Sequence, residues 1–94
     1  MNLQQLKYAQ ALAELGSFVR AAEVCHVTQP TLSNAIAQLE LDLGHKLFER
    51  TTRTVRLTDV GQQLLPDICD LLNAQAALVA RAKSLANPTA RRIR

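Results

Sequence analysis

Neutral hydrogen-bonding side chains gather between residues 28 and 38, in the stretch TQPTLSNAIAQ. Thr28 followed by Pro30 is typical of a helix start, because a threonine side chain caps the first turn and proline fits there without losing a hydrogen bond. The N-terminus of a helix attracts phosphate, and Asn and Gln side chains bind the edges of bases, adenine above all. The chemistry that these residues suggest is hydrogen bonding to a nucleic acid.

Each side chain of this stretch has an expected role. Gln29, Asn34 and Gln38 are candidates for bonds to base edges, and the methyl group of Thr31 for contact with a thymine methyl group. Thr28 and the backbone at Gln29 would bind a phosphate. The competing interpretation is a polar helix face that is only solvated. The complete set of candidate DNA-binding residues is Ser17, Arg20, Thr28, Gln29, Pro30, Thr31, Ser33, Asn34, Gln38, Lys46, Arg50 and Arg53.

The basic residues on either side of the stretch favour contacts with the sugar–phosphate backbone. Arg53 lies at the tip of an expected hairpin and is placed to enter a narrow, A·T-rich minor groove. Arg50 would meet a phosphate or pair with a carboxylate near Glu49. For Lys46 and Arg56, an ordinary surface position is the competing interpretation.

The cysteine and histidine residues could instead indicate an enzyme or a metal-binding protein. Cys25 and His26 are neighbours in sequence, but adjacent residues at a helix end do not face each other. His45 and Cys69 do not complete a standard zinc-ligand spacing with them. We therefore expect no catalytic residue, no metal site and no cofactor.

The composition is that of one small helical domain. The chain has 94 residues, of which 48% are hydrophobic, 20% charged and 3% aromatic, with a net charge of +3. This basic balance is compatible with a polyanionic partner without establishing one. We expect no membrane span and a cytoplasmic, nucleoid-associated protein. Cys25 and Cys69 are expected to be reduced, buried thiols.

Hydrophobic spacing and turn residues divide the chain into short elements. Gly16 and Gly44 are typical helix ends, and Thr58 followed by Asp59 is a typical helix start. In the third helix, apolar residues fall on the face opposite Asn34 and Gln38. The expected elements are helices over 3–15, 18–25 and 28–43, extended segments over 45–50 and 54–57, and a long helix from 59.

The long helix carries apolar residues in alternating steps of four and three, which is typical of a coiled-coil seam. Pro66 leaves open a kink or a late start near Asp67. Its first turns should pack on the chain itself, whereas the remainder is too long for so small a body and favours a parallel or antiparallel partner helix. The expected dimer interface is Leu64, Ile68, Leu71, Leu72, Gln75, Leu78, Val79, Ala82 and Leu85.

The predicted fold is mainly α: a winged helix-turn-helix, with three helices and a two-stranded β wing, followed by a long dimerisation or linker helix. Residues 1–58 would form the DNA-binding domain and 59–86 the linker helix. Residues 87–94 would be a hinge or tail that leads to a further domain.

At this point the sequence resembles the DNA-binding domain of LysR-type transcriptional regulators. The resemblance rests on Ser17, the pair Ala21-Ala22, VTQPTLS, LE, LG, LFER and LTDVG, at unbroken spacing over most of the first two-thirds of the chain. CHVTQPTLS is also similar to the peroxide-sensing branch, whose redox cysteines belong to a domain beyond this sequence. Two positions depart from the family: Asn34, where members often have Arg, and Ala37, which is often polar or basic.

The resemblance implies a homodimer, or a tetramer of the full-length protein, on an inverted-repeat, A·T-rich operator in double-stranded DNA. The third helix would enter the major groove and the wing the minor groove. A small-molecule effector would bind only through a C-terminal domain absent from this sequence. The alternative hypothesis is a winged-helix module for protein–protein assembly that dimerises through its long helix. The lack of charge on the third helix before Glu40 keeps this alternative open. Winged helices of other bacterial regulators, such as the molybdate-responsive ones, are near relatives.

Overall fold

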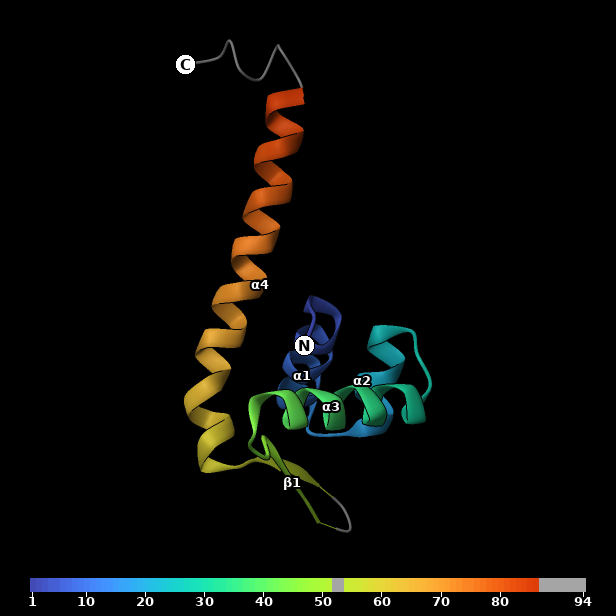
Figure 1. Cartoon of the computed structure of the whole chain (residues 1–94). Coiled ribbons are helices and arrows are strands. Elements are labelled where there is room, and N and C mark those ends of the chain that lie inside the picture. Colours follow the sequence, from blue (N-terminus) through green and yellow to red (C-terminus); the bar gives the residue numbers. More distant parts are fainter. Residues whose placement is uncertain (52–53, 87–94) are drawn as a thin grey trace.

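A computed structural model describes residues 1–51 and 54–86 and confirms the predicted winged helix-turn-helix with a long fourth helix (Figure 1). Three helices come first, a short antiparallel hairpin follows, and a long helix is the last of the described elements. The elements are α1 (Leu3–Leu15), α2 (Phe18–Cys25), α3 (Gln29–Leu43), β1 (Phe48–Arg50), β2 (Val55–Leu57) and α4 (Asp59–Ala86).

The first three helices begin at polar caps and end in left-handed residues. The side chains of Asn2, Ser17 and Thr28 each accept a hydrogen bond from a backbone N–H in the first turn that follows. Helices α1 and α3 end at glycines, while α2 ends at His26 with φ of 59°. This left-handed residue makes the tight turn of the helix-turn-helix, because the N–H of the next residue, Val27, bonds back to the carbonyl of Ala22 at 3.0 Å.

The core lies where α1, α2, α3 and the start of the wing meet. The hydrophobic stripe of α3 is buried as expected, whereas Leu43 at its end is half-buried. On α1 the buried stripe includes Tyr8 and Leu12, and Leu3 is exposed. The buried residues are Leu6, Tyr8, Ala9, Leu12, Ala21, Ala22, Leu32, Ile36, Leu39, Leu47, Phe48, Ile68 and Leu72.

The wing strands are shorter than the sequence indicated. Only three residues of each segment pair, with Phe48 opposite Leu57 and Arg50 opposite Val55. The segment before Phe48 is instead a connection from α3, fixed by a bond from the Thr58 N–H to the Leu47 carbonyl at 2.9 Å. His45 and Lys46, which the sequence placed in an extended segment, therefore lie outside the described hairpin.

Helix α4 starts at Asp59 and continues through Pro66, so a late start near Asp67 is wrong. The hydroxyl of Thr58 caps the first turn by accepting the Gly61 N–H at 2.9 Å, and it donates to the Lys46 carbonyl at 2.6 Å. A proline here costs one intrahelical bond, which the cap at Thr58 and the burial of Ile68 and Leu72 offset.

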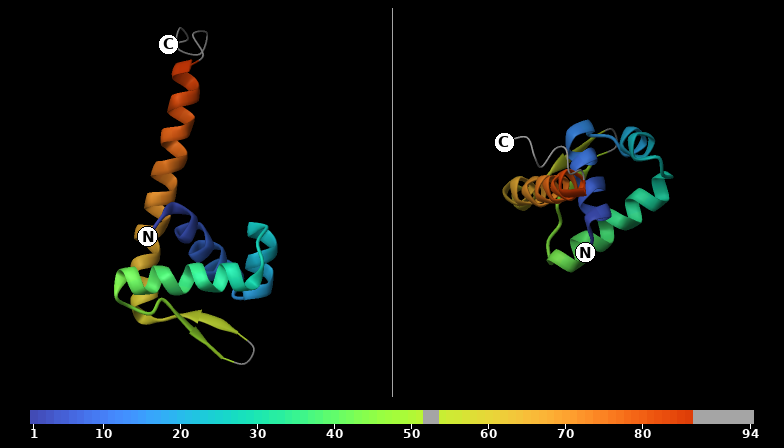
Figure 2. Two further views of the ribbon diagram at one scale, coloured as in Figure 1. Left: turned by 45° about the vertical axis from the view of Figure 1, so that its right-hand side comes forward. Right: turned by 90° about the horizontal axis from the view of Figure 1, so that it is seen from above.

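The four helices are arranged so that α3 lies across the body above the hairpin, while α4 stands beside the body and extends beyond it (Figures 1 and 2). A helix of 28 residues is about 42 Å long. Its last turns, beyond the groove that Gln75 and Val79 line together with α1, therefore extend past the first three helices (Figure 1). No helix within 1–51 or 54–86 is long and apolar enough to cross a membrane.

Candidate nucleic-acid interface

The start of α3 presents an exposed polar face. The side chains of Gln29, Pro30, Thr31 and Asn34 are all exposed. Thr28 Oγ1 accepts the Thr31 N–H at 3.3 Å and donates to Thr31 Oγ1 at 2.9 Å, so this hydroxyl pair closes the first turn. The amides of Gln29 and Asn34 have no hydrogen bond within the described part of the chain, which leaves them available to an external partner.

Gln38 is placed differently from the other two amides. Its Nε2 donates to Asp42 Oδ1 at 3.1 Å, and the N-terminal amino group of Met1 also bonds to Asp42. These two donors, the amino group first, lower the pKa of the Asp42 carboxyl group. Gln38 is exposed, but its amide nitrogen is already occupied, so a contact with a base would use its oxygen or require release from Asp42.

The cationic candidates that the structure describes, Arg20, Lys46 and Arg50, are exposed and come from three different segments of the chain. Arg20 lies in the first turn of α2, whose cap is the Ser17 hydroxyl at 3.2 Å from the Arg20 N–H. Lys46 lies in the connection between α3 and the wing. Arg53, the expected minor-groove residue, lies outside the described residues.

Arg50 is joined to two other elements rather than to a carboxylate. Its Nη2 donates to Ser33 Oγ on α3 at 2.8 Å. Its guanidinium carbon lies 4.0 Å from the centre of the Phe18 ring at the start of α2. The pairing with a carboxylate near Glu49 that the sequence left open is not what this geometry provides.

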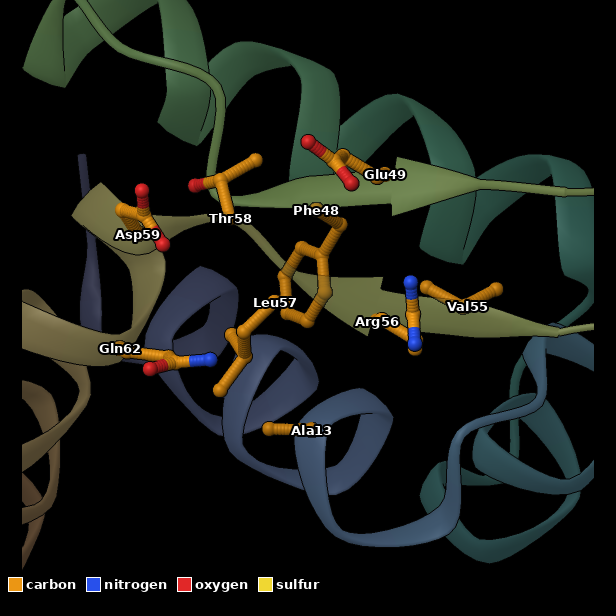
Figure 3. A pocket seen from close by; sticks show the side chains of 9 residues that line it. All are labelled: Ala13, Phe48, Glu49, Val55, Arg56, Leu57, Thr58, Asp59 and Gln62. Atoms are coloured by element: carbon orange, nitrogen blue, oxygen red, sulfur yellow. The ribbon is translucent and has the colours of Figure 1, made fainter.

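A cleft of about 530 Å³ lies between the hairpin and the helices α1 and α4 (Figure 3). Its charged side chains are Glu49, Arg56 and Asp59, so acidic groups outnumber basic ones and disfavour a phosphate. None of the candidate DNA-binding residues that the structure describes lines it. The lining residues are Ala13, Phe48, Glu49, Val55, Arg56, Leu57, Thr58, Asp59 and Gln62.

The cysteines are free and half-buried, which corrects the expectation that both are buried. Burial raises the pKa of the Cys25 thiol, so this group stays protonated near neutral pH and is a poor nucleophile. Cys69 Sγ accepts a bond from Gln10 Nε2 at 3.3 Å, between α1 and α4. Among the described residues, no three His, Cys, Asp or Glu side chains are grouped to hold a metal ion.

The apolar residues of α4 divide into two sets. Ile68 and Leu72 are 6% and 8% exposed, because they pack into the core of the chain's own body. Leu71, Leu78, Val79 and Leu85 are 48%, 67%, 47% and 60% exposed. Of the expected dimer interface, these four exposed residues are therefore available to pack against a second subunit. Of the remaining members, Leu64 and Gln75 are half-buried and Ala82 is exposed.

Two residues that position the interface were not among the sequence candidates. Glu40 on α3 accepts the N–H groups of Leu47 and Phe48 through Oε2 at 2.7 and 3.2 Å. Phe18 supports Arg50. A signal existed for Glu40, since it is the first charged residue of α3. A phenylalanine just after a helix cap, by contrast, is typical of an ordinary core residue.

Comparison with known proteins gives a consistent result. The model for bacterial regulatory helix-turn-helix proteins of the lysR family matches residues 3–62. The regulator TfdT of Cupriavidus pinatubonensis is 46% identical over 97% of this chain and 38% of its own length. The dual regulator OxyR of Escherichia coli is 52% identical over 69% of this chain and 21% of its own length. The chain thus spans well under half of these relatives.

Solved structures match over nearly the whole chain. Full-length OxyR from Pseudomonas aeruginosa, in a variant form, has a TM-score of 0.88 and 40% identity, covering 93% of this chain and 30% of that one. The CbnR DNA-binding domain in complex with DNA has a TM-score of 0.86 and 37% identity, covering 93% and 100%. The BenM DNA-binding domain on a benA site has a TM-score of 0.86 and 35% identity, covering 94% and 99%.

Proposed function

The chain belongs to the LysR family of bacterial regulatory helix-turn-helix proteins, and from that premise we propose that it binds double-stranded DNA sequence-specifically as a homodimer. Helix α3 enters the major groove and the wing lies at the minor groove. The observation that carries this proposal is the exposed, uncharged start of α3, with two amide side chains free to bind base edges.

The positions of the neutral and the charged residues support this docking of α3 and the wing on DNA. Gln29 and Asn34 read bases, while Arg20, Lys46 and Arg53 supply phosphate or minor-groove contacts from the flanks. Arg53 is assigned from the sequence alone. DNA complexes of two similar domains, CbnR and BenM, support the same use of this fold.

The exposed stripe on α4 supports the homodimer. Four large apolar side chains on one free helix would be unfavourable in water without a partner. The charges of α4 favour an antiparallel pair: Asp67 and Asp70 precede Gln75, and Arg81 and Lys83 follow it at nearly equal spacing. In an antiparallel pair centred near Gln75, Asp70 lies level with Arg81 of the partner subunit and on the same flank of the helix, so these two charges attract each other.

Two-fold symmetry then predicts an inverted-repeat operator. An effector-binding domain, a tetramer of the full-length protein and a cytoplasmic location at the nucleoid are further parts of this proposal. They rest on the family, since the chain covers 38% and 21% of the relatives compared above.

Selection of bound sequences from random duplex DNA by the purified chain tests the proposal. We expect an inverted repeat with A·T-rich flanks. Fluorescence anisotropy in a salt series should then give an affinity for this operator that falls linearly in log K against log salt. A scrambled duplex of equal composition is the control. Equal binding to both duplexes, at all salt concentrations, would favour the assembly module instead.

A further inference from the structure

The guanidinium of Arg50 connects the three elements that would meet DNA. It belongs to the wing strand β1, donates to Ser33 on α3 at 2.8 Å and lies over the Phe18 ring of α2 at 4.0 Å. A planar guanidinium can make a directed hydrogen bond and stack on a ring at the same time, which an ammonium cannot do. Arg50 therefore holds one defined position relative to both helices.

The space between α3 and strand β1 beside Arg50 is only partly filled by side chains. A groove of about 500 Å³ lies there, lined by residues that include Ile36, Ala37 and Phe48. Among the interactions of the described residues, two polar ties bracket this groove. The Glu40 carboxylate binds the backbone at Leu47 where the wing begins. The Arg50–Ser33 bond holds the other end, one residue from Asn34.

We infer that Arg50 is a positioning residue that fixes the wing relative to the reading helix before DNA arrives, rather than primarily a phosphate ligand. The inference rests on the proposed DNA binding and deepens it. A duplex sets the separation of its major and minor grooves, so a protein that reads both must hold two elements at a matching distance. Fixing that distance in the free protein lowers the ordering cost of binding.

The bond also sets how Ser33 meets DNA. One lone pair of Ser33 Oγ is occupied by the Arg50 N–H, so the hydroxyl hydrogen points away from the cation. Ser33 thus acts as a hydrogen-bond donor toward an acceptor such as a phosphate oxygen. Its role in binding depends on Arg50.

Four variants test the inference: Arg50→Ala, Arg50→Lys, Ser33→Ala and the double variant Ser33→Ala/Arg50→Ala. Lys7→Ala removes an exposed charge on α1, outside all these contacts, and is the control. The first measurement is the backbone amide NMR spectrum of the free protein. We expect the amides of Glu49, Thr51 and Thr54 to shift in both Arg50 variants and in Ser33→Ala, and to stay unchanged in Lys7→Ala. Unchanged wing amides in the Arg50 variants would overturn the inference even if the wild type binds no operator.

The second measurement is affinity for the selected operator across a salt series. Arg50→Ala should weaken binding by about tenfold, the order expected for losing a hydrogen bond to a charged group. Arg50→Lys should be equally weak, because charge alone does not restore the position. The double variant should be less impaired than the product of the two single losses, and the salt slope should stay close to wild type.

If Arg50 instead acts mainly as a phosphate ligand, the same binding measurements give a different result. A phosphate ligand predicts that Arg50→Lys binds nearly as the wild type and that Arg50→Ala lowers the salt slope by about one unit per subunit. It also predicts that the losses of Ser33→Ala and Arg50→Ala multiply. Any one of these results would overturn the positioning role while leaving the proposed DNA binding intact.

Discussion

The carboxylate of Glu40 accepts the backbone N–H of Leu47 at 2.7 Å and thereby fixes the point at which the chain leaves α3 for the wing. The same oxygen accepts the Phe48 N–H at 3.2 Å. Both donors belong to buried core residues, so without Glu40 two backbone groups at the edge of the core lose their partner. One acidic side chain thus joins the end of the reading helix to the start of the hairpin.

Glu40→Ala should therefore lower the free energy of unfolding by about 1.5–3 kcal/mol, the range for hydrogen bonds to a charged group. Urea denaturation followed by circular dichroism measures this loss. Glu40→Gln keeps one acceptor oxygen and should lose less. Glu23→Ala, an exposed glutamate on α2, is the matched control and should change stability by less than about 0.5 kcal/mol. Equal stability of Glu40→Ala and Glu23→Ala would contradict the role of Glu40.

The helices could be predicted from sequence because caps and hydrophobic spacing are local signals. Asn34 on the exposed face and Leu32 in the core follow directly from the period of α3. The contacts between elements could not be predicted in this way. Nothing local says that Arg50 binds Ser33, which lies 17 residues earlier, since that contact depends on how the wing folds back. The burial of Ile68 likewise depends on where α1 lies, so the heptad pattern alone did not separate core from free surface.

Gly61 lies in the first turn of α4, directly against the backbone of Leu47 in the connection that precedes the wing. A Cβ atom at this position would lie 2.2 Å from the Leu47 carbonyl oxygen, a backbone atom that cannot move without disturbing the hairpin. Gly61→Ala should destabilise the chain by about 1–3 kcal/mol through overpacking, although alanine favours a helix. Thermal unfolding measures it, with Gln63→Ala, exposed on the same helix, as the control. A more stable Gly61→Ala would mean that α4 and Leu47 can separate without cost.

Base reading by α3 is tested at its two free amides. Gln29→Ala and Asn34→Ala should each weaken binding to the selected operator by about 1–3 kcal/mol, because each removes bonds to a base edge. Binding to scrambled DNA should change little, since phosphate contacts remain. Anisotropy titrations of both duplexes measure the difference. If both variants bind the operator as the wild type does, the polar face of α3 is only solvated.

Arg53 is expected, from the sequence, to supply the wing's contact with a narrow minor groove. Arg53→Ala should weaken binding to A·T-flanked operators more than to G·C-flanked ones, because the groove potential is most negative where it is narrow. The salt slope should fall by about one unit per subunit. Arg56→Ala is the comparison and should show no flank preference. An equal loss on both flanks would assign Arg53 to the phosphates.

The arrangement of α4 in the dimer follows from its charges and its exposed apolar residues. Leu78→Asp places a charge at the most exposed leucine of the stripe and should shift the chain to a monomer in sedimentation. Asp70→Arg should weaken the dimer, because in an antiparallel pair it faces the like charge of Arg81 of the partner subunit. Adding Arg81→Asp should restore the dimer, with each exposed pair contributing about 0.2–1 kcal/mol. In a parallel pair Asp70 and Arg81 lie about 16 Å apart along the helix axis, so neither step would change the dimer in this way. A wild type that stays monomeric at high concentration would instead remove the homodimer from the proposal.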